Sequence, residues 1–408
     1  MHAEKRGGAR GGMNITRHRF VTLAPGLCLA LASCANSPIG RRQVARGSDD
    51  VFTVACFYFD FDDVYVGSVR TALNEDLTAA GIPYKEYDAG NDQPTQNKQI
   101  DKAIADGADT LIINLVSSGN TEQADMICQS ADSAGIPAIF FNRPVEAPGY
   151  EGMILNYYDN VAYVGTDAEQ SGRMQGKIIG DYLVEHFDEV DLNGDGRISY
   201  TLFKGQAGNY GADSRTKYSV EVANEILEEH GYPDLAYFDE SSIDRFQLDL
   251  TGSWSLESAQ DYMMTDLLYY NEEQGNMIEL VIANSDAMAE GAINALQAFG
   301  YNDGEEGHTT IPVFGVDASE AGKELIAQGY MTGTVKQDAV AMAACISELV
   351  QNVYDGKDLF SGMDDYPRDE ENGIESKILL PYSAYEPEDT PPASDGDGTS
   401  DGDGSAAV

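Results

Sequence analysis

The segment from Asp191 to Ser199 places oxygen-bearing side chains at alternate positions. Its ligand and turn residues are Asp191, Asn193, Asp195, Gly196, Arg197 and Ser199. This spacing matches the first nine positions of an EF-hand calcium loop, in which Arg197 would contribute its carbonyl oxygen. Hard oxygen ligands without a nearby histidine favour Ca²⁺ over a catalytic transition metal. The twelfth position is Leu202 instead of a glutamate, so one carboxylate must come from elsewhere. A turn without metal is the alternative.

Polar side chains also follow several apolar runs of the chain. They are Asp62, Asp63, Asn114, Asn142, Lys204, Gln206, Asn284, Ser285, Asp286 and Asp317. In open α/β sheets a ligand binds beyond the carboxyl ends of the strands, so these residues predict a site for a polar ligand. No dinucleotide fingerprint, phosphate loop or Gly-x-Ser-x-Gly elbow accompanies them. A carbohydrate hydrolase using Asp62 and Asp63 is disfavoured, because adjacent strand-end side chains usually point apart.

Strand-like apolar runs alternate with helix-length periodic segments along the chain. The predicted strands are 51–59, 110–115, 136–141, 198–203, 278–283 and 311–316. The predicted helices are 68–80, 96–106, 122–134, 172–186, 214–230 and 287–299. This alternation predicts an α/β fold with parallel sheets covered by helices on both faces. Because more than ten strand candidates exceed one ordinary sheet, we expect two doubly wound domains.

The composition excludes one class of partner. The chain has 69 acidic against 25 basic residues, so its surface repels phosphate backbones and nucleic acid is not an expected partner. A hydrophobic fraction of 42% is ordinary for a protein with a buried core. Cys56, Cys128 and Cys345 lie in apolar surroundings outside any metal or redox motif, so we predict buried thiols without a disulfide.

The N-terminus predicts export. Arg17 and Arg19 precede an apolar stretch at 20–32 that is too short to span a bilayer, and translation from Met13 would give a compact signal. The sequence Leu-Ala-Ser-Cys34 resembles a bacterial lipobox, which implies a lipid anchor on Cys34 as the only attachment to the membrane. The alternative is an ordinary signal for soluble export.

Both ends of the chain lie outside the two predicted domains. We assign 1–34 to the signal peptide, 35–50 to a linker and 386–408 to an acidic low-complexity tail. A lactose-repressor-type regulator would need a DNA-binding helix pair where this chain has its export signal.

Several segments match, in order, those of a known family. They are Phe61-Asp-Asp-Val-Tyr65, Gly90-Asn-Asp-Gln93 with Gln96-Asn97, Ile113-Asn-Leu-Val116, Phe140-Phe-Asn142, Tyr163-Val-Gly-Thr-Asp167, the loop at 191–199, Val281-Ile-Ala-Asn-Ser-Asp-Ala-Met288 and Pro312-Val-Phe-Gly-Val-Asp317. Over residues 54–385 the chain resembles the galactose/glucose-binding proteins of bacterial sugar importers. The resemblance implies a type I periplasmic-binding-protein-like fold with two lobes joined by a hinge.

The resemblance also implies roles for individual residues. The residues that match the family's polar sugar contacts are Asp63, Asn114, Arg215 and Asp317. Those that match its two stacking rings are Tyr65 and Trp254. The calcium ligand missing from the loop is matched by Glu279. The chemistry is consistent, because a pyranose offers C–H faces to aromatic rings and a rim of hydroxyls to charged and amide groups.

Four positions depart from the family pattern. Asn209 and Gly211 replace a histidine and an aspartate, while Ser285 and Gln337 each replace an asparagine. We keep Asn209, Ser285 and Gln337 among the expected sugar contacts. Asn209, Tyr210 and Asp213 could compensate for the carboxylate missing at Gly211. A hexose like galactose or glucose is the first expectation, and another aldose or a pentose is the alternative.

We therefore expect an extracytoplasmic lipoprotein, not an enzyme, that captures a monosaccharide by hinge closure and delivers it to the permease of an ABC importer. The predicted N-terminal lobe is 51–141 plus 338–372, and the C-terminal lobe, with the calcium loop, is 142–337 plus 373–385. We expect the protein on the outer face of the cytoplasmic membrane, in the periplasm if the cell has an outer membrane. The alternative output is sensing, in which bound sugar is presented to a chemoreceptor or sensor kinase.

Overall fold

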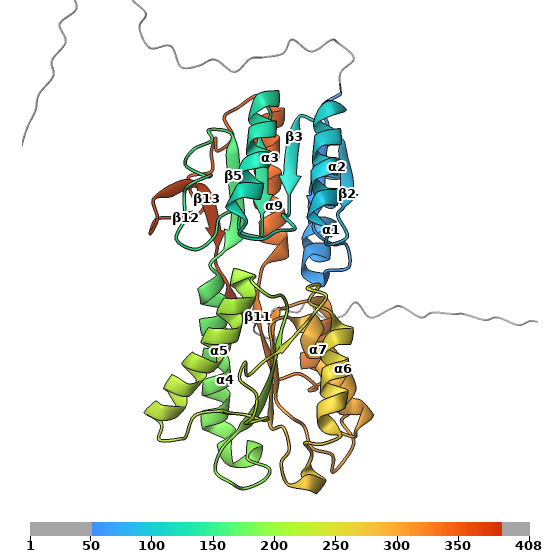
Figure 1. The fold of residues 1–408 in the computed structure, drawn as a ribbon, viewed down its shortest axis with the longest axis vertical. Helices are drawn as coiled ribbons and strands as arrows, with labels where there is room; N and C mark the ends of the chain where they lie inside the picture. The colour runs from blue at the N-terminus through green and yellow to red at the C-terminus, as the bar shows by residue number, and fades with distance from the viewer. Residues whose placement is uncertain (1–50, 386–408) are drawn as a thin grey trace, which may run out of the picture. The chain divides into compact units, whose positions relative to one another are not determined.

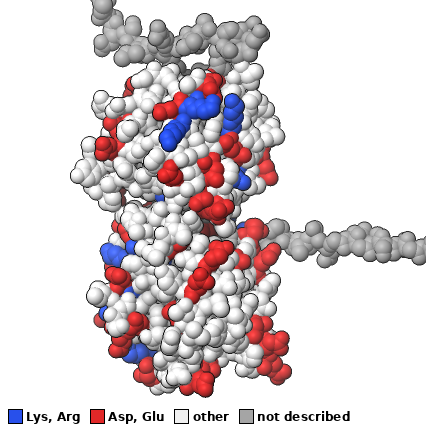
Figure 2. All heavy atoms as spheres, turned by 45° about the vertical axis from the view of Figure 1, so that its right-hand side comes forward, with Lys and Arg blue, Asp and Glu red and all other residues white. Residues whose placement is uncertain are grey.

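The computed structural model describes residues 51–385 of the 408-residue chain. The predicted signal peptide with Cys34, the linker at 35–50 and the acidic tail at 386–408 lie outside the described residues. Between residues 51 and 385, no helix has the length and apolarity needed to cross a membrane. Acidic side chains outnumber basic ones on the face drawn in Figure 2.

The first seven-stranded sheet has the order β12-β13-β5-β4-β3-β1-β2, and every pairing is parallel except β12 with β13. Its strands are β1 (Val54–Tyr58), β2 (Tyr84–Asp88), β3 (Thr110–Ile113), β4 (Ala138–Phe141), β5 (Val161–Thr166), β12 (Arg368–Asp369) and β13 (Ile374–Leu380). The helices of this first lobe are α1 (Val64–Ala79), α2 (Gln93–Ala105), α3 (Thr121–Ala134) and α9 (Ala339–Tyr354).

The second sheet has the order β14-β11-β10-β9-β6-β7, with β8 paired to β6, and only β11 with β14 is antiparallel. Its strands are β6 (Ser199–Lys204), β7 (Ala236–Tyr237), β8 (Gln247–Leu248), β9 (Leu280–Ala283), β10 (Val313–Asp317), β11 (Gly333–Lys336) and β14 (Ser383–Ala384). The helices of this second lobe are α4 (Ala168–Val190), α5 (Tyr210–Glu229), α6 (Leu256–Leu267), the short 3₁₀ helix η1 (Glu272–Gln274), α7 (Asp286–Ala298) and α8 (Glu320–Ala327).

Each sheet buries both faces, which explains its nearly continuous apolar strands. In β1, Cys56 and Tyr58 face the core beneath α1 and α9, whereas Ala55 and Phe57 face the core beneath α2 and α3. The second sheet likewise packs against α4 and α5 on one face and against α6 and α7 on the other (Figure 1). Cys56, Cys128 and Cys345 are buried free thiols, which confirms that prediction.

The close pairing of α4 with α5 depends on small residues. A Cβ on Gly172 would overlap the backbone oxygen of Ser214, and one on Gly176 would meet the Tyr218 carbonyl. These glycines therefore let α5 lie close to α4 and fix the position from which Arg215 projects.

The six predicted strands and six predicted helices are present, with ends shifted by a few residues. The lobe boundaries need correction. β5 pairs with β4 and β13 pairs with β5, so 161–166 and 374–380 belong to the first lobe and not to the second. The chain crosses between lobes after Thr166, Lys336 and Leu380. The crossing predicted at the 337/338 boundary is therefore correct, whereas those predicted after Phe141 and Asn372 lie elsewhere. Since both lobes repeat the same strand and helix alternation, the polarity pattern does not mark where the chain changes sheet.

Candidate functional site

A cavity of about 370 Å³ lies where the carboxyl ends of strands from both sheets meet. This volume is within the range of about 300–1,000 Å³ typical of small-molecule sites. Eight of the nine predicted sugar contacts line it, namely Asp63, Tyr65, Asn209, Arg215, Trp254, Ser285, Asp317 and Gln337. The topology therefore brings together residues that are far apart in the sequence.

The first lobe contributes the start of α1. Asp63 caps this helix, because its carboxylate accepts a 2.8 Å hydrogen bond from Val66 N, and it is only 9% exposed. Burial raises the pKa of Asp63 to about 6, although the Val66 N–H and Arg143 oppose the shift. Tyr65, one position into the helix, is also buried, and its hydroxyl lies 3.6 Å from Met342 Sδ.

Arg143 is a cavity residue that the sequence did not reveal. Its Nε donates to Leu115 O at 2.6 Å, and one NH2 group donates to Val116 O and to Gln206 Oε1, both at 2.8 Å. The guanidinium lies 4.1 Å from the centre of the Phe59 ring. Burial lowers the pKa of Arg143 to about 10, and the nearby carboxylates Asp63 and Asp60 limit the fall. The only signal in the sequence for a role of Arg143 in the cavity was its position shortly after β4.

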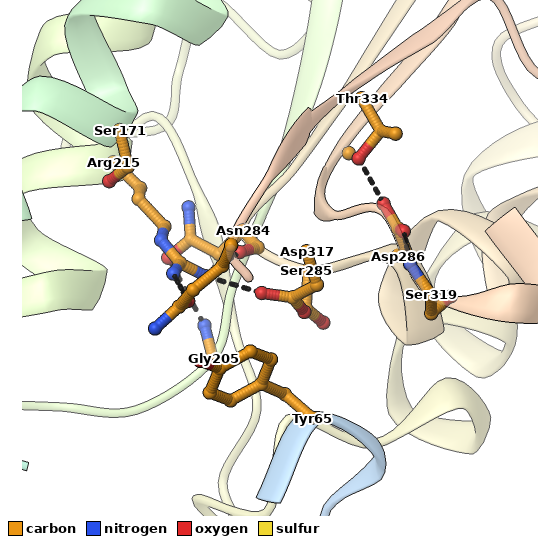
Figure 3. A network of polar contacts seen from close by, with 12 residues as sticks. Tyr65, Ser171, Gly205, Arg215, Asn284, Ser285, Asp286, Asp317, Ser319 and Thr334 are labelled. Carbon is orange, nitrogen blue, oxygen red and sulfur yellow. Dashed lines mark hydrogen bonds and ion pairs between the residues drawn. The ribbon is translucent and has the colours of Figure 1, made fainter. Parts of the chain in front are cut away.

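Arg215, on α5, is the centre of the second lobe's polar groups (Figure 3). It donates to Asn284 O at 2.6 Å, to Gln337 Oε1 at 2.7 Å and to Tyr382 OH at 3.1 Å, and its NH1 lies 3.5 Å from Asp317 Oδ1. These partners come from four different segments, so the guanidinium is fixed in position. Its Nε and the Asn284 Nδ2 are buried and have no hydrogen-bond partner among residues 51–385.

Asp317 lies at the end of β10 and faces Arg215 (Figure 3). Burial raises its pKa well above the usual value, Arg215 opposes the shift, and Asp286 and Asp63 add to it. Asp286 lies behind this group, where its carboxylate accepts from Thr334 Oγ1 at 2.6 Å and from Ser319 N at 2.7 Å. Burial therefore favours the neutral form of the Asp317 carboxyl, and the nearby Arg215 guanidinium favours its ionised form.

Trp254 lies against the backbone at the end of β6, because a Cβ on Gly205 would overlap its ring. Its ring centre is 5.5 Å from the Arg215 guanidinium carbon. Trp254, Asn142 and Asp317 all line the cavity and all have positive φ, of 58°, 59° and 122°. Backbone strain of this kind persists where the surrounding structure enforces it and is frequent at binding sites.

Four of the buried charged groups of the lining balance one another, with Asp63 and Asp317 opposed to Arg143 and Arg215. Two other buried acids of the lining are satisfied elsewhere. Glu146 accepts three backbone N–H bonds and Asp369 pairs with Lys377. The balance favours a neutral ligand with many hydroxyl groups over an anion or a cation.

Comparison with known proteins identifies the family. Residues 54–358 match the family described as a periplasmic binding protein domain. The chain belongs to this family. It is 32% identical to the D-galactose/methyl-galactoside binding periplasmic protein MglB of Haemophilus influenzae, covering 74% of this chain and 82% of that protein. It is 29% identical to a putative rhizopine-binding protein of Rhizobium meliloti, covering 69% and 77%.

Solved structures are similar in fold. A solute binding protein from Clostridium phytofermentans with bound β-D-glucose has a TM-score of 0.62 at 21% identity, covering 82% of this chain and 94% of that chain. One from Bacillus halodurans with bound myo-inositol has a TM-score of 0.59 at 23% identity, covering 84% and 97%. The predicted type I fold is confirmed, and membership places the chain among extracytoplasmic binding proteins and not among enzymes.

One predicted contact of this binding protein lies elsewhere. Asn114 is fully buried and does not line the cavity. Its Nδ2 donates to Phe141 O at 3.1 Å and its Oδ1 accepts from Phe59 N at 3.4 Å, so it links the ends of neighbouring strands. The strand-end position alone could not distinguish a residue that joins strands from one that faces a ligand.

The departing positions around α5 are also resolved. Asn209 caps α5 by accepting from Ala212 N, and Tyr210 and Gly211 line the cavity. Asp213 pairs with Lys204 and is not part of the lining, so it does not replace the missing carboxylate at Gly211.

The loop at 191–199 is folded around its own acidic side chains. Both carboxylate oxygens of Asp191 accept backbone N–H groups, from Asp195 at 3.1 Å and from Gly196 at 2.8 Å. Glu279 is fully buried and reaches the loop as expected, accepting from Asn193 N at 3.1 Å and from Ser199 N at 2.8 Å. Asn193 and Ser199 bring an amide and a hydroxyl oxygen, so the oxygen donors fit a hard cation.

The same loop sets a limit on the metal assignment. No three Asp, Glu, His or Cys side chains within residues 51–385 are arranged closely enough to hold a metal ion. The donor set expected here is mixed, with the amide of Asn193, the carbonyl of Arg197 and the hydroxyl of Ser199 beside the acids. Calcium binding therefore stays a prediction.

Proposed function

We propose that this binding protein captures a neutral monosaccharide, most simply a hexose of the galactose or glucose type, and delivers it to the permease of an ABC importer. The observation that carries the proposal is the cavity, in which Asp63 and Tyr65 of one lobe face Arg215, Trp254 and Asp317 of the other. Paired charges would bond the hydroxyl rim, and the two rings would cover the apolar faces of the sugar.

The relatives support a sugar and leave its identity open. MglB is named for D-galactose and methyl-galactoside, and structures of similar fold hold β-D-glucose, D-allose or myo-inositol. At Gly211 no side chain is available for a hydroxyl, and Asn209 uses its oxygen to cap α5. We therefore keep another aldose or a pentose as the alternative ligand.

Closure about the hinge would bury the sugar. Within residues 51–385 the lobes are connected by the crossings after Thr166, Lys336 and Leu380. Rotation about these short segments would bring Tyr65 and Trp254 onto opposite faces of the ligand. The importer would recognise the closed form of the protein.

We further propose that the loop at 191–199 and Glu279 hold one structural Ca²⁺. Asp191, Asn193, Asp195, Ser199 and Glu279 would bind through side-chain oxygens and Arg197 through its carbonyl. The ion would join the end of α4 to the strand after Glu279, two elements distant in sequence. It would supply stability and no chemistry.

The anchor is a separate proposal. Acylation of Cys34 would hold the mature protein at the outer face of the cytoplasmic membrane. Labelling of cells with a fatty-acid probe should mark the wild-type protein and leave Cys34→Ser unlabelled, and equal labelling would contradict the anchor.

Calorimetric titration with galactose, glucose, allose, xylose, arabinose, ribose and myo-inositol tests the central proposal. We expect saturable binding of at least one sugar, and that this binding is lost in Arg215→Ala and retained in Asp213→Ala, whose carboxylate lies outside the cavity. Absence of binding to every sugar would contradict the proposal. Preference for a pentose would replace the hexose assignment.

A further inference from the structure

The loop between β8 and α6 is organised by one buried carboxylate. Asp249 is 2% exposed, and its Oδ1 accepts from Thr251 N at 2.8 Å and from Thr251 Oγ1 at 2.7 Å. Its Oδ2 accepts from Ser255 N at 2.9 Å, and its own N–H donates to Lys204 O at 2.9 Å. The side chain of Asp249 therefore closes the segment 249–255, and its backbone N–H joins that segment to the end of β6.

This segment carries the chain's single tryptophan. Trp254 has a φ of 58°, and its ring lies where any side chain larger than a hydrogen atom on Gly205 would overlap it. Because a tryptophan does not adopt this conformation without enforcement, the hydrogen bonds on either side of it, at Thr251 and Ser255, must hold the backbone. Asp249 accepts both of them.

The same segment touches the first lobe. Asn91 Nδ2 donates to Thr251 O at 2.9 Å, and Ser253 Oγ donates to Asp60 Oδ2 at 3.1 Å. Gln206, whose side chain packs against Gly252, accepts from Arg143. The loop that presents the ring to the cavity therefore also supplies hydrogen bonds between the two lobes.

We propose that Asp249 is a positioning residue that couples sugar stacking to lobe closure. This inference rests on the proposed sugar-binding function and adds a residue that does not line the cavity. When the carboxylate holds 249–255 in place, one rigid unit presents Trp254 to the ligand and the Thr251 and Ser253 groups to the first lobe. Without it, both sets of contacts are lost together.

Asp249→Ala tests the proposal, with Asp239→Ala as the matched control. Asp239 lies in the same lobe and makes the same kind of turn, accepting from Ser241 N at 3.0 Å and from Ser241 Oγ at 2.6 Å, but it does not line the cavity. Both variants remove an aspartate that caps a turn two residues on. Asp249 is more buried and also accepts from Ser255 N, so its removal should cost more stability, and the comparison therefore rests on affinity and quenching instead of melting temperature.

Two measurements are made on each purified protein. Calorimetry with galactose and glucose gives the affinity. Acrylamide quenching of the single tryptophan, without sugar, reports directly on the loop. We expect Asp249→Ala to weaken affinity at least about tenfold and to increase quenching. We expect Asp239→Ala to leave both within about twofold of the wild type.

An Asp249→Ala protein that melts earlier but keeps wild-type affinity and quenching would overturn the inference, because the carboxylate would then be only structural. If Asp249→Ala fails to fold, Asp249→Asn, which retains one acceptor oxygen, serves for the same two measurements with the same criteria. If the wild type binds neither sugar, the hexose proposal fails, while the quenching comparison still decides whether Asp249 positions Trp254.

Discussion

The loop at 191–199 and the cavity both gather side-chain oxygens, but they assemble them differently. In the loop, every expected ligand except Glu279 comes from one short segment, and the carboxylates already accept backbone N–H groups. In the cavity, Asp63, Arg215 and Asp317 come from distant segments of two lobes, and the buried Nε of Arg215 has no partner among the described residues. A local motif forms its own structure, whereas the cavity leaves polar groups for a ligand to satisfy.

This difference predicts that the two regions can be disabled separately. Damage to the cavity should abolish sugar binding and leave the response to metal intact. Damage to the loop should do the reverse, since no cavity residue belongs to the loop.

The largest effect is expected from Arg215→Ala. Removing the guanidinium leaves Asp317 buried without its ion-pair partner, and truncation of such a pair costs about 2–5 kcal/mol. Sugar affinity should fall at least about 100-fold by calorimetry, while the chelator-induced change in melting temperature should match that of the wild type. Retained affinity would show that Arg215 does not contact the sugar.

Asp63→Asn should change the pH dependence of the sugar-free protein. The folded pKa of about 6 lies above the unfolded value, so the folded chain keeps a proton that the unfolded chain loses, and stability falls as the pH rises from about 4 to 6. Asparagine removes this loss, which amounts to at most about 3 kcal/mol, and it can still cap α1. Denaturant titrations at pH 4, 5, 6 and 7 measure the difference, and parallel curves for the two proteins would refute it.

Glu279→Gln should abolish cation binding at the loop and leave sugar binding in the cavity unchanged. At a free cation concentration of about 100 times Kd, binding adds about 2.7 kcal/mol to the free energy of unfolding. A chelator removes this contribution. Scanning calorimetry should show a lower melting temperature after chelation of the wild type and little change in Glu279→Gln. A wild-type protein that is indifferent to chelator would contradict the calcium assignment, whereas lost sugar affinity in Glu279→Gln would contradict the separation of the two regions.

Asn114→Ala should have the smallest effect on binding. Its amide joins the ends of β1, β3 and β4, so its removal should cost about 1–3 kcal/mol of stability. Sugar affinity should stay within about twofold, because the side chain does not line the cavity. A large loss of affinity with unchanged melting would return Asn114 to the ligand contacts.

Much of the fold could be predicted because its signals are local. Apolar runs such as 136–141 and periodic segments such as 287–299 define a strand and a helix by themselves. The lobe boundaries could not be predicted, because β5 and β13 have the same character as strands of either sheet and only their pairing partners assign them.

In the site, too, some residues could be predicted from the sequence and others could not. Asp63 and Asp317 were visible as polar residues at strand ends, and the resemblance added Tyr65 and Trp254. Arg143 was missed because its role depends on the carbonyls of Leu115 and Val116, after β3, and on Gln206 in the other lobe. Asn114 has the same strand-end position but turns to its neighbouring strands, a choice that only three-dimensional packing decides.

A crystal structure of the complex with the sugar that binds most tightly tests the central claim most directly. We predict that the sugar lies between the rings of Tyr65 and Trp254, with its hydroxyls bonded to Asp63, Arg215 and Asp317. A sugar bound outside this cavity, or one that leaves both rings and Arg215 without contact, would contradict the account.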